Sequence, residues 1–137
     1  MIDRLLIVGH GSIGQRHIRI ARSLLPKADI RVLRHKSFQS IPEYANECVS
    51  DLAEALAFSP QAAVIASPST FHLQSAQPLA ELGVHLLVEK PLSASVFGVT
   101  ELLATCTLRN VVLMTAYNLR FLPSLRKYRD LIHLGLI

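Results

Sequence analysis

The sequence lacks any long uninterrupted apolar run, and its longest apolar stretches have the length of a single β-strand. A membrane-spanning helix needs about 18 consecutive apolar residues, so we expect no membrane partner. The residues before Gly9 hold too few apolar side chains for a signal-peptide core, and they lack a small-residue cleavage site. We therefore expect a soluble protein of the cytoplasm.

Cysteine is also scarce, with Cys48 and Cys106 as the only two in 137 residues. Neither has the spacing of a metal-ligand pair, so we expect no metal site, and an intracellular setting favours buried thiols over a disulfide. The chain has no Tyr-x-x-x-Lys pair either, which argues against an enzyme of the short-chain dehydrogenase type.

Charged residues make up only 18% of the chain, whereas hydrophobic residues make up 50% and the mean hydropathy is +0.36. The net charge is +4, but the basic residues are scattered and only residues 31–36 form a local cluster. Nucleic-acid binding would need a longer basic face, so we expect no nucleic-acid partner. The length fits one domain, and the high apolar share indicates that something covers part of its surface.

Apolar runs alternate with amphipathic segments at regular spacing, which predicts β-α-β units around a sheet whose strands are buried on both faces. The expected fold class is α/β, a doubly wound, mostly parallel six-stranded sheet of the Rossmann type. Strands are expected at 5–8, 30–33, 47–49 (a short edge strand), 62–66, 84–88 and 111–116. Helices are expected at 12–25, 51–58, 70–82, 95–107 and from about 123 onward.

Single residues mark the ends of several expected helices. Asp51 with Glu54 three residues later has the capping-box arrangement. Gly83 is expected to end its helix as a left-handed C′ residue, and Pro123 suits a first helical turn.

Residues 9–14 (GHGSIG) lie between the first expected strand and the first expected helix, in the order that a dinucleotide-binding turn requires. In such a turn Gly9 permits the sharp bend, Gly11 lets the backbone approach the pyrophosphate, and Gly14 lets helix and strand pack closely. The helix start at Ser12 and Ile13 would supply amides and a favourable dipole for the phosphates. The alternative is a turn that is merely structural.

The acidic residue that grips the ribose 2′-hydroxyl in NAD enzymes is absent about 20 positions later, where Arg34 and His35 stand instead. Asp29 precedes the second strand and so lies at its wrong end. A guanidinium at the strand end can clasp a 2′-phosphate, which favours NADP over NAD as the cofactor. The alternative is a solvated surface cluster.

Lys90 follows the apolar run at 84–88, between Glu89 and a proline that stops the strand. It is therefore expected to project its amine into the crevice where open α/β sheets bind ligands. A lysine after a strand is more often a solvated charge, but the neighbouring Glu and Pro favour a role in chemistry. Close to the cationic ring of an oxidised nicotinamide, its pKa would be lowered toward the range useful for proton transfer.

With these motifs placed, the chain resembles the N-terminal domain of the Gfo/Idh/MocA family, named after glucose-fructose oxidoreductase, inositol dehydrogenase and a rhizopine-catabolism protein. The resemblance rests on residues 9–14, then 66–72 (ASPSTFH), 83–92 (GVHLLVEKPL) and 117–123 (YNLRFLP), in that order. It implies an oxidoreductase domain that binds NADP or NAD, over residues 1–120, followed by a linking helix at 121–137.

The resemblance also implies roles for single residues. Ser67, Pro68 and His72 would border the dinucleotide, although His72 is also placed to cap or pack a helix. Glu89 would lie beside the nicotinamide ribose, and Lys90 would hydrogen-bond the hydroxyl or carbonyl that reacts. Asn118 and Arg120 would line the crevice near the nicotinamide. Two further histidines are ambiguous: we expect His10 to face solvent, and His17 either to help bind phosphates or to lie on a polar helix face.

Family members continue into a second α/β domain that supplies most substrate contacts, and the chain stops where that domain would begin. We therefore expect a fragment, an isolated domain or a truncated gene product. The implied reaction moves a hydride between nicotinamide and a CH–OH or C=O carbon of a sugar-like or polyol-like substrate, and we expect this chain to be inactive alone. The alternative is a non-catalytic dinucleotide-binding module or an enzyme remnant, with a methyltransferase a distant third. Members commonly associate through the second domain, so both a monomer and a homo-oligomer stay open.

Overall fold

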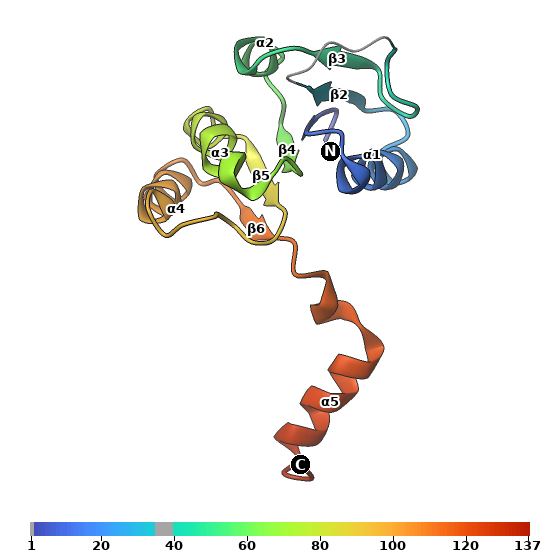
Figure 1. The fold of residues 1–137 in the computed structure, drawn as a ribbon, viewed down its shortest axis with the longest axis vertical. Coiled ribbons are helices and arrows are strands. Elements are labelled where there is room, and N and C mark those ends of the chain that lie inside the picture. The colour runs from blue at the N-terminus through green and yellow to red at the C-terminus, as the bar shows by residue number, and fades with distance from the viewer. Residues whose placement is uncertain (1, 35–39) are drawn as a thin grey trace.

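A computed structural model, which describes residues 2–34 and 40–137, contains a six-stranded sheet with helices on both faces (Figure 1). All five strand pairs are parallel, and the strand order is β3-β2-β1-β4-β5-β6. The strands are β1 (Arg4–Val8), β2 (Asp29–Leu33), β3 (Glu47–Val49), β4 (Ala62–Ile65), β5 (His85–Val88) and β6 (Leu113–Thr115). The predicted doubly wound α/β fold is confirmed, with the short strand at 47–49 at one edge.

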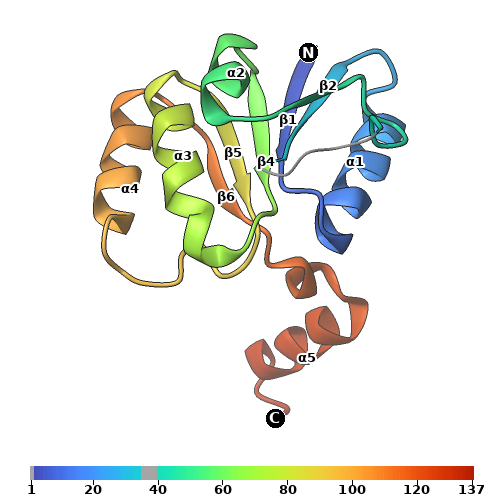
Figure 2. The ribbon, with the colours of Figure 1, turned by 45° about the horizontal axis from the view of Figure 1, so that its top comes forward.

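Helices connect these strands as expected. They are α1 (Ser12–Leu24), α2 (Leu52–Ala57), α3 (His72–Glu81), α4 (Val99–Leu108) and α5 (Pro123–His133), with the 3-10 turns η1 (Ser69–Phe71) and η2 (Asn118–Phe121). Because side chains alternate along a strand, β1 contributes to a separate core on each face of the sheet. Leu5 and Ile7 pack with Ile18 of α1, whereas Leu6 and Val8 share a core with residues of α2, α3 and α4. Figure 2 shows α1 on one side of the sheet and α3 and α4 on the other.

The register brings the carboxyl ends of the central strands to one level. Val8 pairs with both Leu33 and Ile65, and Ile65 pairs in turn with Val88. The residues that follow these four strands therefore emerge side by side along one edge of the sheet. Gly9, Arg34, Ala66 and Glu89 each follow one of these strand ends directly, whereas the motif at 117–123 lies beyond β6.

The largest difference from the expected elements concerns α4, which begins at Val99 rather than near residue 95. Gly98 adopts a left-handed conformation (φ +80°) directly before it, and the preceding residues form a loop. Strand β6 is also shorter than expected, because the amide of Val111 donates to Cys106 O at the end of α4. The amide of Val112 donates instead to His85 Nδ1.

The expected helix ends are found with one change. Asp51 caps α2 by accepting a hydrogen bond from the Glu54 amide at 2.8 Å. The Glu54 carboxylate, however, accepts from the amide and hydroxyl of Ser50 rather than from Asp51, so the capping box is shifted by one residue. Gly83 has φ +79° after α3, and Pro123 is at the first turn of α5, as predicted.

Two further features concern thiols and surface. Cys48 and Cys106 are buried free thiols, as expected, and burial raises the pKa of each.

No helix among residues 2–34 and 40–137 is long and apolar enough to cross a membrane. The α5 helix extends away from the sheet (Figures 1 and 2), and none of its residues is buried.

Candidate functional site

The glycine turn at residues 9–14 lies at the point where the strand order reverses, between β1 and its neighbours β2 and β4. In open α/β sheets this switch point forms the ligand-binding crevice. Gly9 has φ +97°, and a Cβ there would lie 2.8 Å from the Ser67 amide nitrogen. A Cβ on Gly14 would collide with the Gly9 carbonyl oxygen. Gly9 is therefore required for the bend and for its close contact with the backbone after β4. Gly14 is required for the close approach of α1 to that turn.

Gly11 differs from these two glycines. It has an ordinary φ of −70°, and a Cβ there would meet no atom within 4 Å. Ser12 and Ile13 begin α1 directly after it and are exposed, so the free amides of this helix end face open space. Open space beside a helix N-terminus can accommodate a bound phosphate.

A pocket of about 640 Å³ opens at the same edge of the sheet. Four of the predicted cofactor residues line it together: Gly9, Arg34, Ser67 and Pro68. Val8, His10, Leu33, Phe71 and Gln74 complete the lining. The walls are largely apolar and include a few polar groups, which is the composition of a cofactor site.

Ser67 carries an unmatched polar atom in this pocket. Its Oγ is buried and has no hydrogen-bond partner among the described residues. Because buried polar atoms are nearly always hydrogen-bonded, this hydroxyl is a candidate partner for a ligand that enters the pocket. The residues present therefore fit a dinucleotide that lies along the glycine turn and along the turn at residues 66–68, here called the Ser67 turn.

Arg34 follows β2 on the far wall of this pocket. Its amide donates to Val49 O at 3.0 Å, which fixes the backbone against the end of β3. Its side chain is half-buried and lines the pocket. His35, the second residue predicted to contact a 2′-phosphate, lies outside the described residues.

His10 was expected to face solvent but is half-buried between two hollows. Burial lowers the pKa of its imidazole below the ordinary 6.5, and the nearby Arg34 guanidinium lowers it further. At neutral pH the ring is therefore uncharged. The folded state binds this proton less tightly than the unfolded chain does. The stability that the neutral His10 ring contributes is therefore lost as the pH falls from 6.5 through the lower pKa of the folded state.

We expect an Arg34→Gln variant to raise the His10 pKa, because it removes one of the two groups that oppose protonation. The pKa stays below 6.5, since burial is the larger cause. Histidine ring shifts in an NMR pH titration measure this change, with the exposed His133 as an internal reference. A His10 midpoint identical in both proteins would contradict the contact with Arg34.

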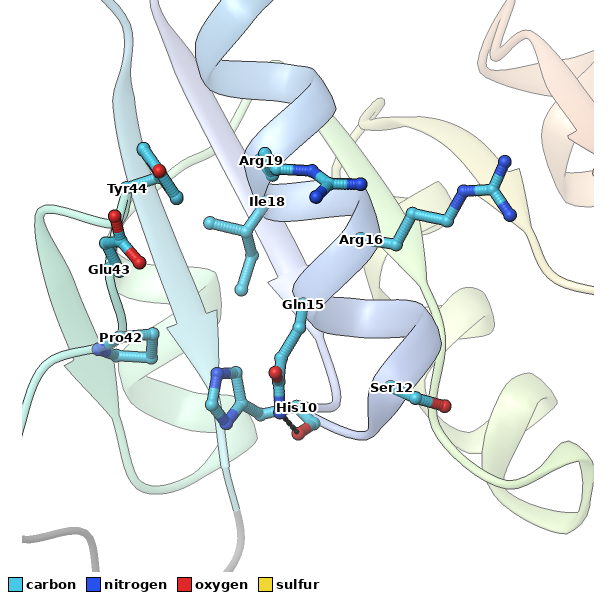
Figure 3. A pocket seen from close by; sticks show the side chains of 9 residues that line it. All are labelled: His10, Ser12, Gln15, Arg16, Ile18, Arg19, Pro42, Glu43 and Tyr44. Carbon is cyan, nitrogen blue, oxygen red and sulfur yellow. Dashed lines mark hydrogen bonds between the residues drawn. The ribbon is translucent and has the colours of Figure 1, made fainter.

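A second hollow of about 410 Å³ lies on the other side of His10 (Figure 3). Residues of α1 form one wall, and Pro42, Glu43 and Tyr44 form the other. The figure shows the His10 ring between Pro42 and Gln15, whose Nε2 donates to His10 O at 3.4 Å. His10 thus separates this hollow from the pocket beside Ser67.

Glu89 and Lys90 emerge from the end of β5 at the same edge. The Lys90 side chain is exposed and makes no hydrogen bond or ion pair with another described residue. Glu89 is occupied: one carboxylate oxygen lies 2.8 Å from His17 Nε2, and the other accepts from the Lys90 amide at 3.2 Å. His17 therefore faces β5 rather than the phosphate side of α1.

His72 occupies the interior behind the Ser67 turn, where only 1% of its surface is exposed. Its Nε2 lies 2.8 Å from Ser67 O, and its Nδ1 lies 3.0 Å from Pro91 O. The ring thus contacts the backbone of two predicted site segments. The Lys90–Pro91 peptide bond beside it is cis.

Asn118 and Arg120 are placed apart from this pocket. Both belong to η2 and are exposed, beyond the end of β6. Arg120 lines a separate hollow with residues of α5, including Leu125 and Arg129. Among the described residues, no group of three or more His, Cys, Asp and Glu side chains is arranged to hold a metal ion.

Sequence reasoning missed several lining and supporting residues. Phe71 and Gln74 line the pocket because η1 turns the start of α3 toward it. The contact between His17 and Glu89 joins residues 72 positions apart, and only the packing of α1 on the sheet brings them together. The spacing of His17, three residues after the last glycine of the turn, was the only available signal.

Comparison with known proteins agrees with this geometry. The chain is 29% identical over 135 residues to the uncharacterized oxidoreductase YrbE of Bacillus subtilis, a match that covers 94% of this chain and 39% of YrbE. It is 28% identical over 136 residues to the scyllo-inositol 2-dehydrogenase (NADP(+)) IolU of the same organism, covering 95% and 41%. The chain thus spans less than half the length of these relatives.

Among solved structures, the scyllo-inositol dehydrogenase of Lactobacillus casei with bound NAD(H) and scyllo-inositol superposes with a TM-score of 0.82. The identity is 21%, and the match covers all of this chain and 42% of that protein, so it supports the fold. Residues 4–117 also match the family described as an oxidoreductase family with an NAD-binding Rossmann fold. The chain therefore belongs to the Gfo/Idh/MocA oxidoreductase family, as its N-terminal, NAD(P)-binding Rossmann domain.

Proposed function

We propose that this chain is the cofactor-binding part of an oxidoreductase that moves a hydride between nicotinamide and a CH–OH or C=O carbon of a sugar-like or polyol-like substrate. The observation that carries the proposal is the pocket at the sheet's switch point, bounded by the glycine turn and by Ser67 with its unpaired hydroxyl oxygen. Gly11 and the start of α1 would hold the pyrophosphate, and Ser67 and Pro68 would border the rest of the dinucleotide.

We propose NADP as the preferred cofactor. Arg34 lies at the end of β2, where an acidic residue would favour the free 2′-hydroxyl of NAD, and the pocket opens beside it. A guanidinium can donate two parallel hydrogen bonds to a phosphate. The NADP(+) named for the relative IolU supports this preference.

Lys90 is the residue that we propose acts at the substrate. When bound, the nicotinamide supplies the group that accepts or donates the hydride. Lys90 would hydrogen-bond the reacting oxygen, polarise it, and exchange the proton that accompanies its oxidation or reduction. Its exposed amine, at the same sheet edge as the cofactor pocket and without a partner in the described chain, is free to take this role.

Residues 1–120 would form the dinucleotide-binding domain, and residues 121–137 would link it to a substrate-binding part. The relatives are more than twice as long as this chain, and α5 and η2 leave Phe121, Leu125 and Tyr128 exposed. Exposed apolar side chains in such number are typical of a surface that is covered in the whole protein. We propose that Asn118 and Arg120 face the substrate side there, and that the chain is inactive alone.

Titration of the chain with NADPH, followed by nicotinamide fluorescence, tests the proposal. We expect saturable binding, with unchanged affinity in a Lys90→Met variant because Lys90 would contact the substrate rather than the pyrophosphate. Absence of binding at millimolar NADPH would refute the function. Weaker NADPH binding by the Lys90→Met variant would instead indicate that Lys90 contacts the cofactor.

A non-catalytic dinucleotide-binding module is the second candidate. It is favoured by the position of Asn118 and Arg120, two predicted crevice residues that lie apart from the cofactor pocket. This function predicts NADPH binding without oxidation of any polyol or sugar, including when a longer form with a second domain is tested. Turnover by a longer form, lost on Lys90→Met, would exclude it.

A further inference from the structure

Each residue that flanks Lys90 is contacted by a histidine, and the two histidines come from different helices. Before it, Glu89 lies 2.8 Å from His17 Nε2 of α1, and these side chains are only 20% and 18% exposed. After it, Pro91 O lies 3.0 Å from Nδ1 of His72, the first residue of α3. Lys90 itself is exposed.

The hydrogen-bond direction at Glu89 follows from the groups involved. An ionised carboxylate only accepts, so His17 Nε2 carries the hydrogen and donates. The other Glu89 oxygen accepts from the Lys90 amide at 3.2 Å. His17 therefore orients a carboxylate that in turn fixes the peptide of Lys90.

His72 differs from His17, because both of its ring nitrogens have a partner. Both of its ring nitrogens face backbone carbonyl oxygens, Ser67 O and Pro91 O, which also only accept. A neutral ring can donate to one of these oxygens and an imidazolium ring to both, and in either form the ring lies between the two segments. His72 then ties the turn that lines the cofactor pocket to the segment that carries Lys90.

We propose that His17 and His72 are positioning residues that hold the chain before and after Lys90 and thereby fix the point from which its amine acts. The inference rests on the proposed role of Lys90 and adds how that lysine is placed. Its tests read the state of the two rings and of the Lys90 peptide without cofactor or turnover. A failure here is therefore distinguishable from a failure of NADPH binding.

The first test is ¹⁵N NMR of the histidine rings in the whole chain at neutral pH. We expect a slowly exchanging ring N–H from His72 and an Nε2–H from His17, with signals assigned from His17→Gln and from the exposed control His133→Gln. A His72 ring without any slowly exchanging N–H would overturn its role.

The second test is hydrogen exchange of the Lys90 amide. In His17→Leu, Glu89 loses its anchor, and we expect Lys90 to exchange about tenfold faster, the range for a hydrogen bond to a charged group. His17→Gln keeps a donor and should restore slow exchange, whereas His133→Leu should have no effect. Unchanged Lys90 exchange in a folded His17→Leu, or equal acceleration at a core amide such as Val32, would overturn the positioning role.

His72→Leu serves as the parallel variant, read at the amide of Glu89, which donates to Ile65 O at 2.8 Å between the same two segments. Because His72 is buried, this variant is open to unfolding as a whole. In that event the ring signature of the unmodified chain decides the role of His72. If the variant folds, we expect faster exchange at Glu89, because the Ser67 turn and the Lys90 segment lose their shared contact. Unchanged exchange at Glu89 in the folded variant would overturn the link.

Discussion

A Gly14→Ala variant is expected to lose about 1 to 3 kcal/mol of unfolding free energy, because overpacking a tight contact costs this much. The added methyl would collide with the Gly9 carbonyl oxygen, which belongs to a turn that is itself pressed against the backbone of Ala66 and Ser67. The helix must therefore move away from β1, and its amides move with it. NADPH binding should weaken at least about tenfold, since phosphate contacts depend on that helix end.

Gly11→Ala is the matched control for this variant. Its methyl would meet no atom of the chain within 4 Å, and its φ of −70° suits any residue. The unfolding free energy, measured by urea denaturation, should stay within about 0.5 kcal/mol of the parent. NADPH binding should still weaken, because the methyl enters the space proposed for the pyrophosphate. Equal stability of both variants would contradict the close packing of α1 on Gly9.

The cofactor preference is expected to reverse in an Arg34→Glu variant. The change removes a cation from the proposed 2′-phosphate position and places an anion there, while the amide bond to Val49 O is kept by any side chain. We expect the ratio of NADPH to NADH affinity to fall about 100-fold, equivalent to about 2.7 kcal/mol. Parallel fluorescence titrations with the two reduced cofactors measure this ratio.

Arg109→Glu provides the control for the change in net charge. Arg109 caps the exposed end of α4, remote from the pocket at the end of β2. The same two-unit change in charge there should leave the ratio of NADPH to NADH affinity unaltered. If Arg34→Glu weakened both cofactors equally, Arg34 would act on the shared phosphates and the preference for NADP would be wrong.

Much of the fold was predictable because its signals are local. Buried parallel strands appear as continuous apolar runs, and Gly83 and Pro123 mark helix ends by their backbone preferences. The start of α4 was misplaced because Ser95 offers an ordinary helix start, whereas the actual boundary depends on Gly98 adopting a positive φ. That conformation follows from tertiary packing, which the local sequence does not record.

The candidate site also has parts that the sequence predicts and parts that it does not. The glycine turn and the strand-end positions of Arg34, Ser67 and Lys90 follow from pattern alone, since parallel strands end at one edge. The internal position of His72 does not, because a histidine near a helix start is equally typical of a ligand and of a packed side chain. The pairing of His17 with Glu89 depends on how α1 packs on the sheet, which no short motif specifies.

The level edge formed by Val8, Leu33, Ile65 and Val88 separates two kinds of evolutionary change. The strands beneath it supply the stable frame, and substitutions there alter packing on both faces of the sheet. The segments above it carry the candidate site, but the rings of His17 and His72 join them, so replacing one segment would also disturb its neighbour. A scaffold of this kind can therefore change its chemistry through its loops, provided that linked loops change together.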